Sequence, residues 1–153
     1  RIQQEDFDTA AELAALRSGN AGAMVSFTGL VREFSGNSQI TNIYLEHYPG
    51  MSERALRDII AEAGTRWRLL GVRLIHRIGT LLPGDQIVLV AVAAEHRAEA
   101  FAACEFIMDY LKTDAPFWKR EQTPEGAVWL ETRTSDIQRS DRWQMPGETI
   151  HHE

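Results

Sequence analysis

The 153 residues of the chain, 44% hydrophobic and 25% charged, are typical of one globular domain, and a formal net charge of −6 argues against a general binder of nucleic-acid backbones. No apolar run reaches the roughly 20 residues of a membrane-spanning helix, and no N-terminal segment has the pattern of a secretory signal. One cysteine, Cys104, excludes an internal disulfide and a cysteine-based zinc site, so we expect a cytoplasmic protein without a metal centre.

The first half of the chain is predicted to hold two helices around a strand hairpin. A capping box that begins at Thr9 and leucines at helical spacing predict a helix over 5–18. Residues 22–34 and 39–48 are rich in β-branched and aromatic residues on either side of a Ser-Gly-Asn-Ser turn, which predicts a hairpin. The next helix is expected to begin at Ser52, where apolar residues recur with a period of 3.6.

The second half repeats this alternation of strands and helices. Residues 71–79 and 86–94 are predicted strands, the second nearly all apolar and therefore central. The longest helix is expected over 95–113, and a last hairpin around the turn 123–126. The order of elements predicts an α+β fold with a mostly antiparallel sheet and packed helices. We expect a single domain over 1–143 and a flexible C-terminal tail over 144–153.

Lysine is the rare cation in this sequence. Only two of the sixteen Lys and Arg residues are lysines, Lys112 and Lys119, and both lie in the stretch YLKTDAPFWKRE. Two residues of any type can fall close together by chance, whereas lysines that served only solubility would be scattered. We interpret the pair as candidates for a cationic site.

A helical wheel of residues 95–113 places two cations near the side that we expect to be buried. Arg97 falls within the apolar stripe, and Lys112 lies at its edge. Because an unpaired buried charge is costly, each needs a carboxylate partner, a cleft that favours positive charge, or a path for its head group to the surface. The apolar stripe comprises Phe101, Cys104, Met108 and Leu111, and the solvent-facing stripe comprises Glu95, Glu99, Glu105 and Asp109.

The spacing of these two cations predicts a dimer. Arg97 and Lys112 are separated by ~22 Å along one helix, at ~1.5 Å per residue. They cannot easily bind the same small group within one chain. If both belong to one site, a second copy of the chain supplies one of them, and a two-fold axis brings the start of one helix near the end of the other.

Lys119 has the surroundings of a reactive amine. Phe117 and Trp118 can exclude water from it, and Arg120 adds a like charge. Desolvation and like charge both lower the pKa of a lysine, which favours a general base or a nucleophile near neutral pH. The alternative is a structural lysine that Trp118 covers through a cation–π contact.

Three further side chains have both functional and structural interpretations. Arg32, expected on a strand, either belongs to the cationic site or pairs with Glu33 or Glu46. His47 and His76 lie in predicted strands and are interpreted as structural. No spacing of histidines, cysteines and carboxylates predicts a metal site, and no phosphate-binding loop or nucleophile elbow is present.

The motifs FTGLVREF, LEHYPGM, IHRIGTLLPGD, AEHR, FIMDYLKTDAPFWKRE and TPEGAVW occur in this order over residues 24–132. In this the chain resembles the catalytic (large) subunit of molybdopterin synthase. The resemblance implies an α/β-hammerhead type of α+β fold and a homodimer at the centre of a heterotetramer. The implied partner is a small ubiquitin-like sulfur carrier with a Gly-Gly thiocarboxylate. The implied reaction adds sulfur to cyclic pyranopterin monophosphate, opens its cyclic phosphate and gives molybdopterin.

The resemblance also implies a site without a cofactor or metal. Lys119 would be the catalytic amine and Lys112 its supporting cation. Two other functions are open at this point: a non-catalytic module that docks a ubiquitin-like tail or an anionic ligand, and a Schiff-base lyase that uses the same lysine. The implied substrate-binding residues are Leu30, Val31, Arg32, His96, Arg97, Lys112, Lys119, Arg120 and Glu121.

Overall fold

A four-stranded sheet forms the centre of the protein, for which a computed structural model describes residues 1–130 and 141–143. Its strands, in spatial order, are β1 (Ile2–Gln3), β6 (Gly71–Arg77), β8 (Gln86–Ala94) and β2 (Ala23–Leu30). β1 runs parallel to β6, and the other two pairs are antiparallel. β8 is buried over most of its length because its sequence is almost continuously apolar, as predicted for a central strand.

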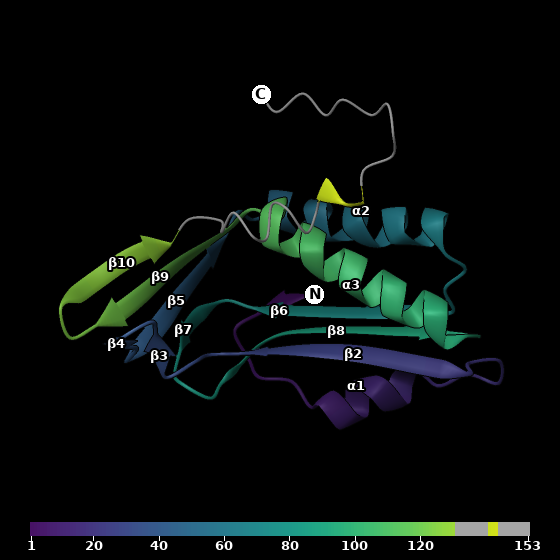
Figure 1. The fold of residues 1–153 in the computed structure, drawn as a ribbon, viewed down its shortest axis with the longest axis horizontal. Coiled ribbons are helices and arrows are strands. Elements are labelled where there is room, and N and C mark those ends of the chain that lie inside the picture. The colour runs from purple at the N-terminus through teal and green to yellow at the C-terminus, as the bar shows by residue number, and fades with distance from the viewer. Residues whose placement is uncertain (131–140, 144–153) are drawn as a thin grey trace.

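Helices cover both faces of this sheet (Figure 1). The helices of the described residues are α1 (Thr9–Leu16), α2 (Met51–Arg66) and α3 (Arg97–Thr113). α1 packs on one face over Ile75 and Leu89, and α2 and α3 pack on the other over Val90. The larger core therefore lies between the sheet and the helix pair α2–α3. None of the described helices is long and apolar enough to cross a membrane.

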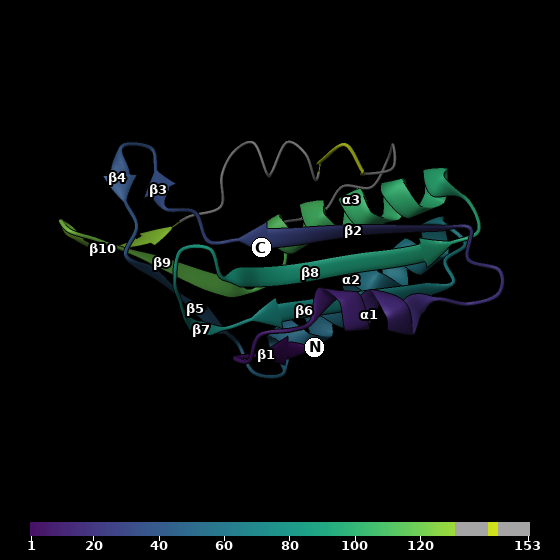
Figure 2. The same ribbon diagram turned by 90° about the horizontal axis from the view of Figure 1, so that it is seen from below.

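A second sheet lies beside the first and has its own small core (Figure 2). Its strands, in spatial order, are β10 (Gly126–Leu130), β9 (Phe117–Thr123), β5 (Asn42–His47) and β7 (Gly79–Leu81). A two-residue ladder joins β3 (Phe34–Ser35) to β4 (Ser38–Gln39). All pairs in the second sheet are antiparallel, so the predicted α+β fold with mostly antiparallel pairing is confirmed.

The predicted hairpin between 22–34 and 39–48 is wrong. β2 pairs with β8 in the main sheet, whereas β5 pairs with β9 and β7 in the second sheet. The chain leaves the main sheet at Val31, whose N–H donates to the carbonyl of Asp85 at 2.9 Å. Val31 is also buried in the core of the second sheet, so it links the two sheets. Arg32 consequently lies outside a strand, contrary to the prediction.

The buried side of α3 differs from the predicted one. Cys104, Met108 and Leu111 are buried as expected, but Arg97 and Phe101 are exposed, Phe101 to 61%. Asp109, expected in solvent, is only 5% exposed. The reason is that α3 approaches the sheet through alanines, which a helical wheel treats as neutral. The buried residues of α3 are Ala100, Ala103, Cys104, Phe106, Ile107, Met108, Asp109 and Leu111.

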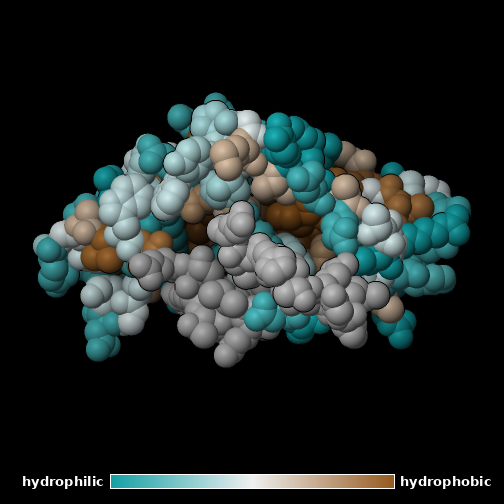
Figure 3. All heavy atoms as spheres, turned by 90° about the horizontal axis from the view of Figure 1, so that it is seen from above, coloured by the Kyte–Doolittle hydropathy of each residue, from teal (hydrophilic) through white to brown (hydrophobic). Residues whose placement is uncertain are grey.

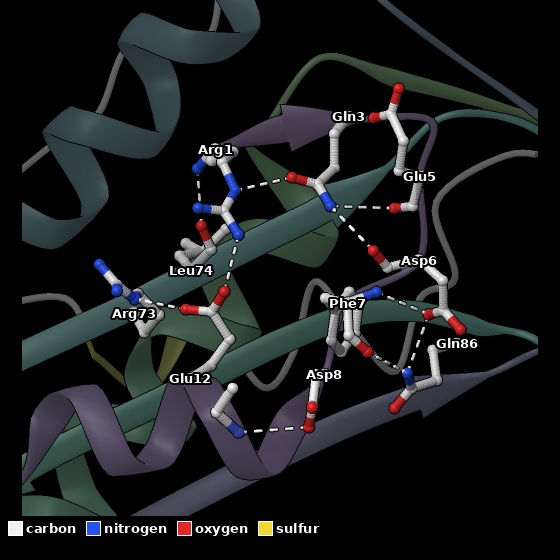
Figure 4. A network of polar contacts seen from close by, with 11 residues as sticks. Arg1, Gln3, Glu5, Asp6, Phe7, Asp8, Glu12, Arg73, Leu74 and Gln86 are labelled. Carbon is white, nitrogen blue, oxygen red and sulfur yellow. Dashed lines mark hydrogen bonds and ion pairs between the residues drawn. The ribbon is translucent and has the colours of Figure 1, made fainter.

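A polar network fixes α1 and the N-terminal residues to β6 and β8 of the main sheet (Figure 4). The carboxylate of Glu12 accepts hydrogen bonds from Arg1 at 2.7 Å and from Arg73 at 2.6 Å. Asp8 caps the helix, since its carboxylate accepts the N–H of Ala11 at 3.2 Å. The predicted capping box at Thr9 is therefore wrong by one residue, and Glu12 instead joins α1 to β6.

The last described residues, 141–143, lie on the face of the molecule that carries α2 and α3. Trp143 packs edge-on against Trp67 and Phe106, with ring centroids 5.6 Å from each. The end of the last predicted strand, at 131–132, and the predicted tail over 144–153 lie outside the described residues. The division into a domain over 1–143 and a tail stays a prediction.

Candidate active site

The two lysines of the chain flank one tight turn. Lys112 lies in the last turn of α3 and is exposed, and Lys119 lies on β9, where its side chain is 34% exposed. Between them the N–H of Phe117 donates to the carbonyl of Ala115 at 2.9 Å. The predicted end of the helix before Pro116 is confirmed.

Lys119 is paired with a buried carboxylate. Side chains two residues apart on a strand point to the same face, and Lys119 Nζ lies 3.8 Å from Oε1 of Glu121. Glu121 is only 4% exposed, and its Oε1 has no hydrogen-bond partner among the described residues. A buried carboxylate is costly without a cation nearby. Glu121 therefore holds the amine of Lys119 in place, and its Oε1 can still accept a hydrogen bond.

The neighbours of Lys119 in sequence face the other side of the sheet. Trp118 packs near Tyr48, with ring centroids 6.0 Å apart. The guanidinium of Arg120 lies over the rings of Tyr44 and Trp129, 5.1 and 5.5 Å from their centroids. The prediction that Trp118 shields the amine of Lys119 is thus wrong, because alternate residues of a strand point apart. Arg120 thus makes two cation–π contacts from this strand.

Two buried polar residues, which the sequence did not indicate as part of the site, hold the turn. His76 stacks on Phe117 with ring centroids 3.9 Å apart, and Ser52 donates a hydrogen bond to the carbonyl of Pro116 at 2.8 Å. The pKa of His76 is lowered to about 4, mainly by burial; the hydrogen bond with the carbonyl of Arg77 raises it, and the nearby charge of Lys112 lowers it. His76 was correctly expected to be structural within a strand, but its contact with the turn depends on residues distant in sequence.

The predicted residues around Arg32 form the exposed end of β2. Leu30 is 55% exposed and Arg32 is exposed as well, whereas the side chain of Val31 is buried. Both backbone groups of Val31 are also bonded, to Asp85 and Gly84. The alternative interpretation of Arg32, an ion pair with Glu33 or Glu46, has no support, since neither pair forms in the described part of the chain. Its guanidinium is therefore available to an anion.

His96 and Arg97 lie far from the lysines in a single chain. His96 immediately precedes α3 and Arg97 is its first residue, both exposed, while Lys112 is in the last turn of this 17-residue helix. The structure therefore brings Lys119 and Glu121 together, places Lys112 across the turn, and leaves His96 and Arg97 at the opposite end of α3.

A groove on the helix face has the wrong charge for this site. Figure 3 shows apolar residues gathered in a recess on the side that carries α2 and α3. A groove between these helices has apolar walls and a rim with three carboxylates, which disfavours an anion. Its lining residues are Ala55, Asp58, Ile59, Glu62, Phe106, Tyr110 and Asp114. Across residues 1–130 and 141–143, no three His, Cys, Asp or Glu side chains are grouped to hold a metal ion.

These features define an α+β protein with an amine–carboxylate pair and further cations, suited to acting on anionic groups. A family model described as MoaE protein matches residues 2–114. A curated relative from Ralstonia nicotianae, named molybdopterin synthase catalytic subunit, is 56% identical over 145 residues, which are 94% of this chain and 82% of the relative. The chain belongs to the MoaE family.

Solved structures agree with this assignment. A molybdopterin biosynthesis MoaE protein from Burkholderia ambifaria is 53% identical, with a TM-score of 0.79 over 94% of this chain and 95% of that one. A complex of subunits 1 and 2 of the molybdopterin-converting factor from Helicobacter pylori is 24% identical, with a TM-score of 0.70 over 87% and 90%, and shows the shared fold. The resemblance indicated by the motifs is confirmed. The protein is an enzyme of molybdenum cofactor biosynthesis, of the molybdopterin synthase class.

Proposed function

We propose that the protein transfers sulfur from the thiocarboxylated C-terminus of a small ubiquitin-like carrier to cyclic pyranopterin monophosphate, and so forms molybdopterin. The observation that carries this proposal is the pair of Lys119 and the buried Glu121, with Lys112 across the turn. For each sulfur, a carbon–sulfur bond to the pterin forms as a carbon–oxygen bond of the pterin breaks. Water cleaves the acyl–sulfur bond, so that the carrier terminus ends as a carboxylate. Two carrier termini supply the two sulfur atoms of the product. This proposal assigns a catalytic role to Lys119 and a supporting role to Lys112.

Both reactants in this proposal are anions. A thiocarboxylate and a phosphate have to approach each other on a protein whose formal net charge is −6, and a local group of cations offsets their repulsion. Lys112 suits the carrier terminus and the charge that develops as sulfur adds. Lys119 either removes a proton or holds an intermediate covalently. In both roles Glu121 keeps the amine in place.

The remaining cations complete the site if it is shared between two chains. Arg32 follows one end of β2, and His96 and Arg97 lie near its other end, since Ala23 pairs with Ala94. An antiparallel two-fold contact between two copies of β2 would place the His96–Arg97 end of one chain beside Arg32 of the other. The phosphate of the pterin would bind there.

The exposed side of β2 supports this dimer. Among the described residues β2 is an edge of the main sheet, and long open edges usually pair or are covered. Apolar side chains that a monomer would hide are exposed around it: Met24 at 36%, Phe27 at 41% and Phe101 at 61%. We propose a homodimer formed through this face, at the centre of a heterotetramer with two carrier subunits.

The carrier is the partner implied by the sequence resemblance, and the Helicobacter pylori structure described above is of a complex of two subunits. The extended terminus of the carrier would reach the amine of Lys119.

We also propose that the protein works in the cytoplasm. In the fold, burial raises the pKa of the Cys104 thiol to about 11, so Cys104 is a packing residue.

The test is to measure molybdopterin formation from the pterin and the thiocarboxylated carrier. Lys119→Ala is expected to lower the rate at least ~100-fold because it removes the reacting amine, while the affinity for the carrier changes little. Arg17→Ala, an exposed cation after α1, is the matched control. Unchanged turnover by Lys119→Ala would refute the role of Lys119. Product formation without the thiocarboxylated carrier would refute the proposed sulfur donor.

A further inference from the structure

The turn between α3 and β9 is held by two side chains from distant parts of the chain. Lys112 precedes this turn and Lys119 follows it, so its conformation sets how the two amines lie relative to each other. Ser52 comes from the first turn of α2, and His76 from β6 of the main sheet. Each is almost completely buried, at 0% and 7% exposure. Neither is among the residues assigned to the reaction above.

Ser52 makes two hydrogen bonds at the turn. Its hydroxyl donates to the carbonyl of Pro116 at 2.8 Å and accepts the N–H of Tyr48 at 2.9 Å. The first bond joins residues 64 positions apart in sequence. Since Ser52 is itself fixed within α2, the carbonyl of Pro116 has a defined position relative to the main core.

His76 holds the next residue through its ring. The imidazole is stacked on Phe117 at a centroid distance of 3.9 Å and an angle of 13°. Its Nδ1 lies 2.8 Å from the carbonyl of Arg77. In a neutral imidazole the nitrogen that faces a carbonyl carries the proton, so this bond fixes both the tautomer and the plane of the ring. Phe117 therefore rests on a rigid, flat surface.

The position of Phe117 is transmitted to Lys119. The two residues are two apart on β9 and share a face of the sheet. If Phe117, the first residue of β9, is displaced, the amine of Lys119 is therefore displaced with it. Misplacement by about 1 Å can lower a rate ~100-fold when catalysis depends on orientation.

We propose that Ser52 and His76 are positioning residues, which hold the α3–β9 turn so that Lys112 and Lys119 act on the same substrate. This inference rests on the proposed function and names residues of the same site. His76 does this as a neutral ring, because burial disfavours its charged form and the nearby charge of Lys112 would repel a protonated imidazole.

Two substitutions of His76 separate the stack from the hydrogen bond. His76→Phe keeps a flat ring against Phe117 and loses the bond to Arg77, whereas His76→Asn can keep that bond and loses the stack. We expect His76→Asn to lower kcat roughly tenfold with little change in KM, and His76→Phe to stay within about threefold of the original kcat. Ser52→Ala is expected to resemble His76→Asn.

Ile75→Ala is the matched control for stability. Ile75 precedes His76 on β6 but packs on the opposite face, against Phe7 and Leu89. It should lower Tm without changing kcat at a temperature where the protein is folded. The positioning role is wrong if kcat falls in proportion to Tm in all three variants, Ile75→Ala, His76→Asn and His76→Phe. It is also wrong if His76→Asn keeps the full kcat.

A second measurement does not depend on turnover. Only two lysines are present, so reductive methylation with ¹³C gives two lysine NMR signals, which Lys112→Arg and Lys119→Arg variants assign. We expect His76→Asn to shift both signals and Ile75→Ala to leave them in place. Unshifted signals in His76→Asn would overturn the inference. Shifted signals in a protein that forms no molybdopterin would instead count against the proposed function alone.

Discussion

The indole N–H of Trp143 donates to the buried carboxylate of Asp109 at 2.7 Å, across 34 positions of sequence. Arg142 donates to the same oxygen at 2.9 Å, and Arg66 donates to the carbonyl of Trp143 at 2.6 Å. The contact explains why α3 buries an acidic residue, since a buried carboxylate is tolerated when charged and polar donors surround it. It also fastens the end of the described chain to the helix that carries Lys112.

Loss of this contact should cost stability. Trp143→Phe keeps most of the packing on Trp67 and Phe106 but removes the donor to Asp109, so we expect the free energy of unfolding to fall by about 1–2 kcal/mol. Urea denaturation at pH 7 measures it. Trp118→Phe is the control, because Trp118 is 51% exposed and should change stability by less than about 0.5 kcal/mol. Equal effects of the two substitutions would mean that the bond contributes nothing.

The charge of Glu121 should matter for catalysis more than its shape. Glu121→Gln preserves the size of the side chain and removes the negative charge beside Lys119, so we expect kcat to fall about tenfold through loss of orientation. Steady-state kinetics with carrier and pterin measure it. Glu125→Gln, in the exposed turn between β9 and β10, is the control. A Glu121→Gln protein with the kcat of the unaltered enzyme would show that the carboxylate has no part in the reaction.

Shared sites predict complementation between two inactive chains. In a mixed dimer of Arg97→Ala and Lys119→Ala chains, one site receives Lys119 from the first chain and Arg97 from the second, and the other site lacks both. Random mixing makes half of the dimers mixed, so we expect about one quarter of the original activity. The measurement is molybdopterin formation after co-refolding. No recovery, with mixed dimers detected by mass, would contradict a site built from two chains.

The buried imidazole of His76 should make the protein less stable in acid. Its pKa is lowered from 6.5 to about 4 in the folded state, mainly by burial. Between these values the unfolded chain binds the proton and the folded protein does not, so stability falls as the pH decreases from 6.5 to 4, by up to about 3 kcal/mol. Above pH 6.5 this loss is absent.

The His76→Phe variant isolates the contribution of the imidazole. Carboxylates and the other histidines titrate in both proteins, so the difference between their unfolding free energies at pH 7, 6 and 5 reports on His76. We expect the variant to lose less stability than the unaltered protein over this range. Parallel pH dependences would show that His76 titrates normally.

Much of the fold could be predicted wherever the signal was local. The apolar run of β8 predicted a central strand, and the sequence around the turn 123–126 predicted the hairpin of β9 and β10. Pairing between distant strands could not be predicted. β2 and β5 are separated in the sequence only by the two-residue strands β3 and β4, yet they belong to different sheets. The partner of a strand depends on which edges the rest of the fold leaves open.

The candidate site was likewise predictable only where the signal was local. The rarity of lysine was enough to indicate Lys112 and Lys119 as candidates, and the motifs around them indicated the family. The orientation of α3 was mispredicted at Phe101 and Asp109, because helix packing depends on how closely two surfaces approach and not only on the apolar pattern.

The amino-acid sequence by itself determined the chemistry available to this protein: a pair of amines, few in number and close along the chain, in a molecule that is otherwise negative. The tertiary structure alone decided that Glu121 is buried beside Lys119 and that Ser52 and His76 hold the turn between the amines. Such contacts join residues up to 64 positions apart. They form only when the two sheets and the helix layer pack together, because no local pattern encodes the distance between side chains on separate elements.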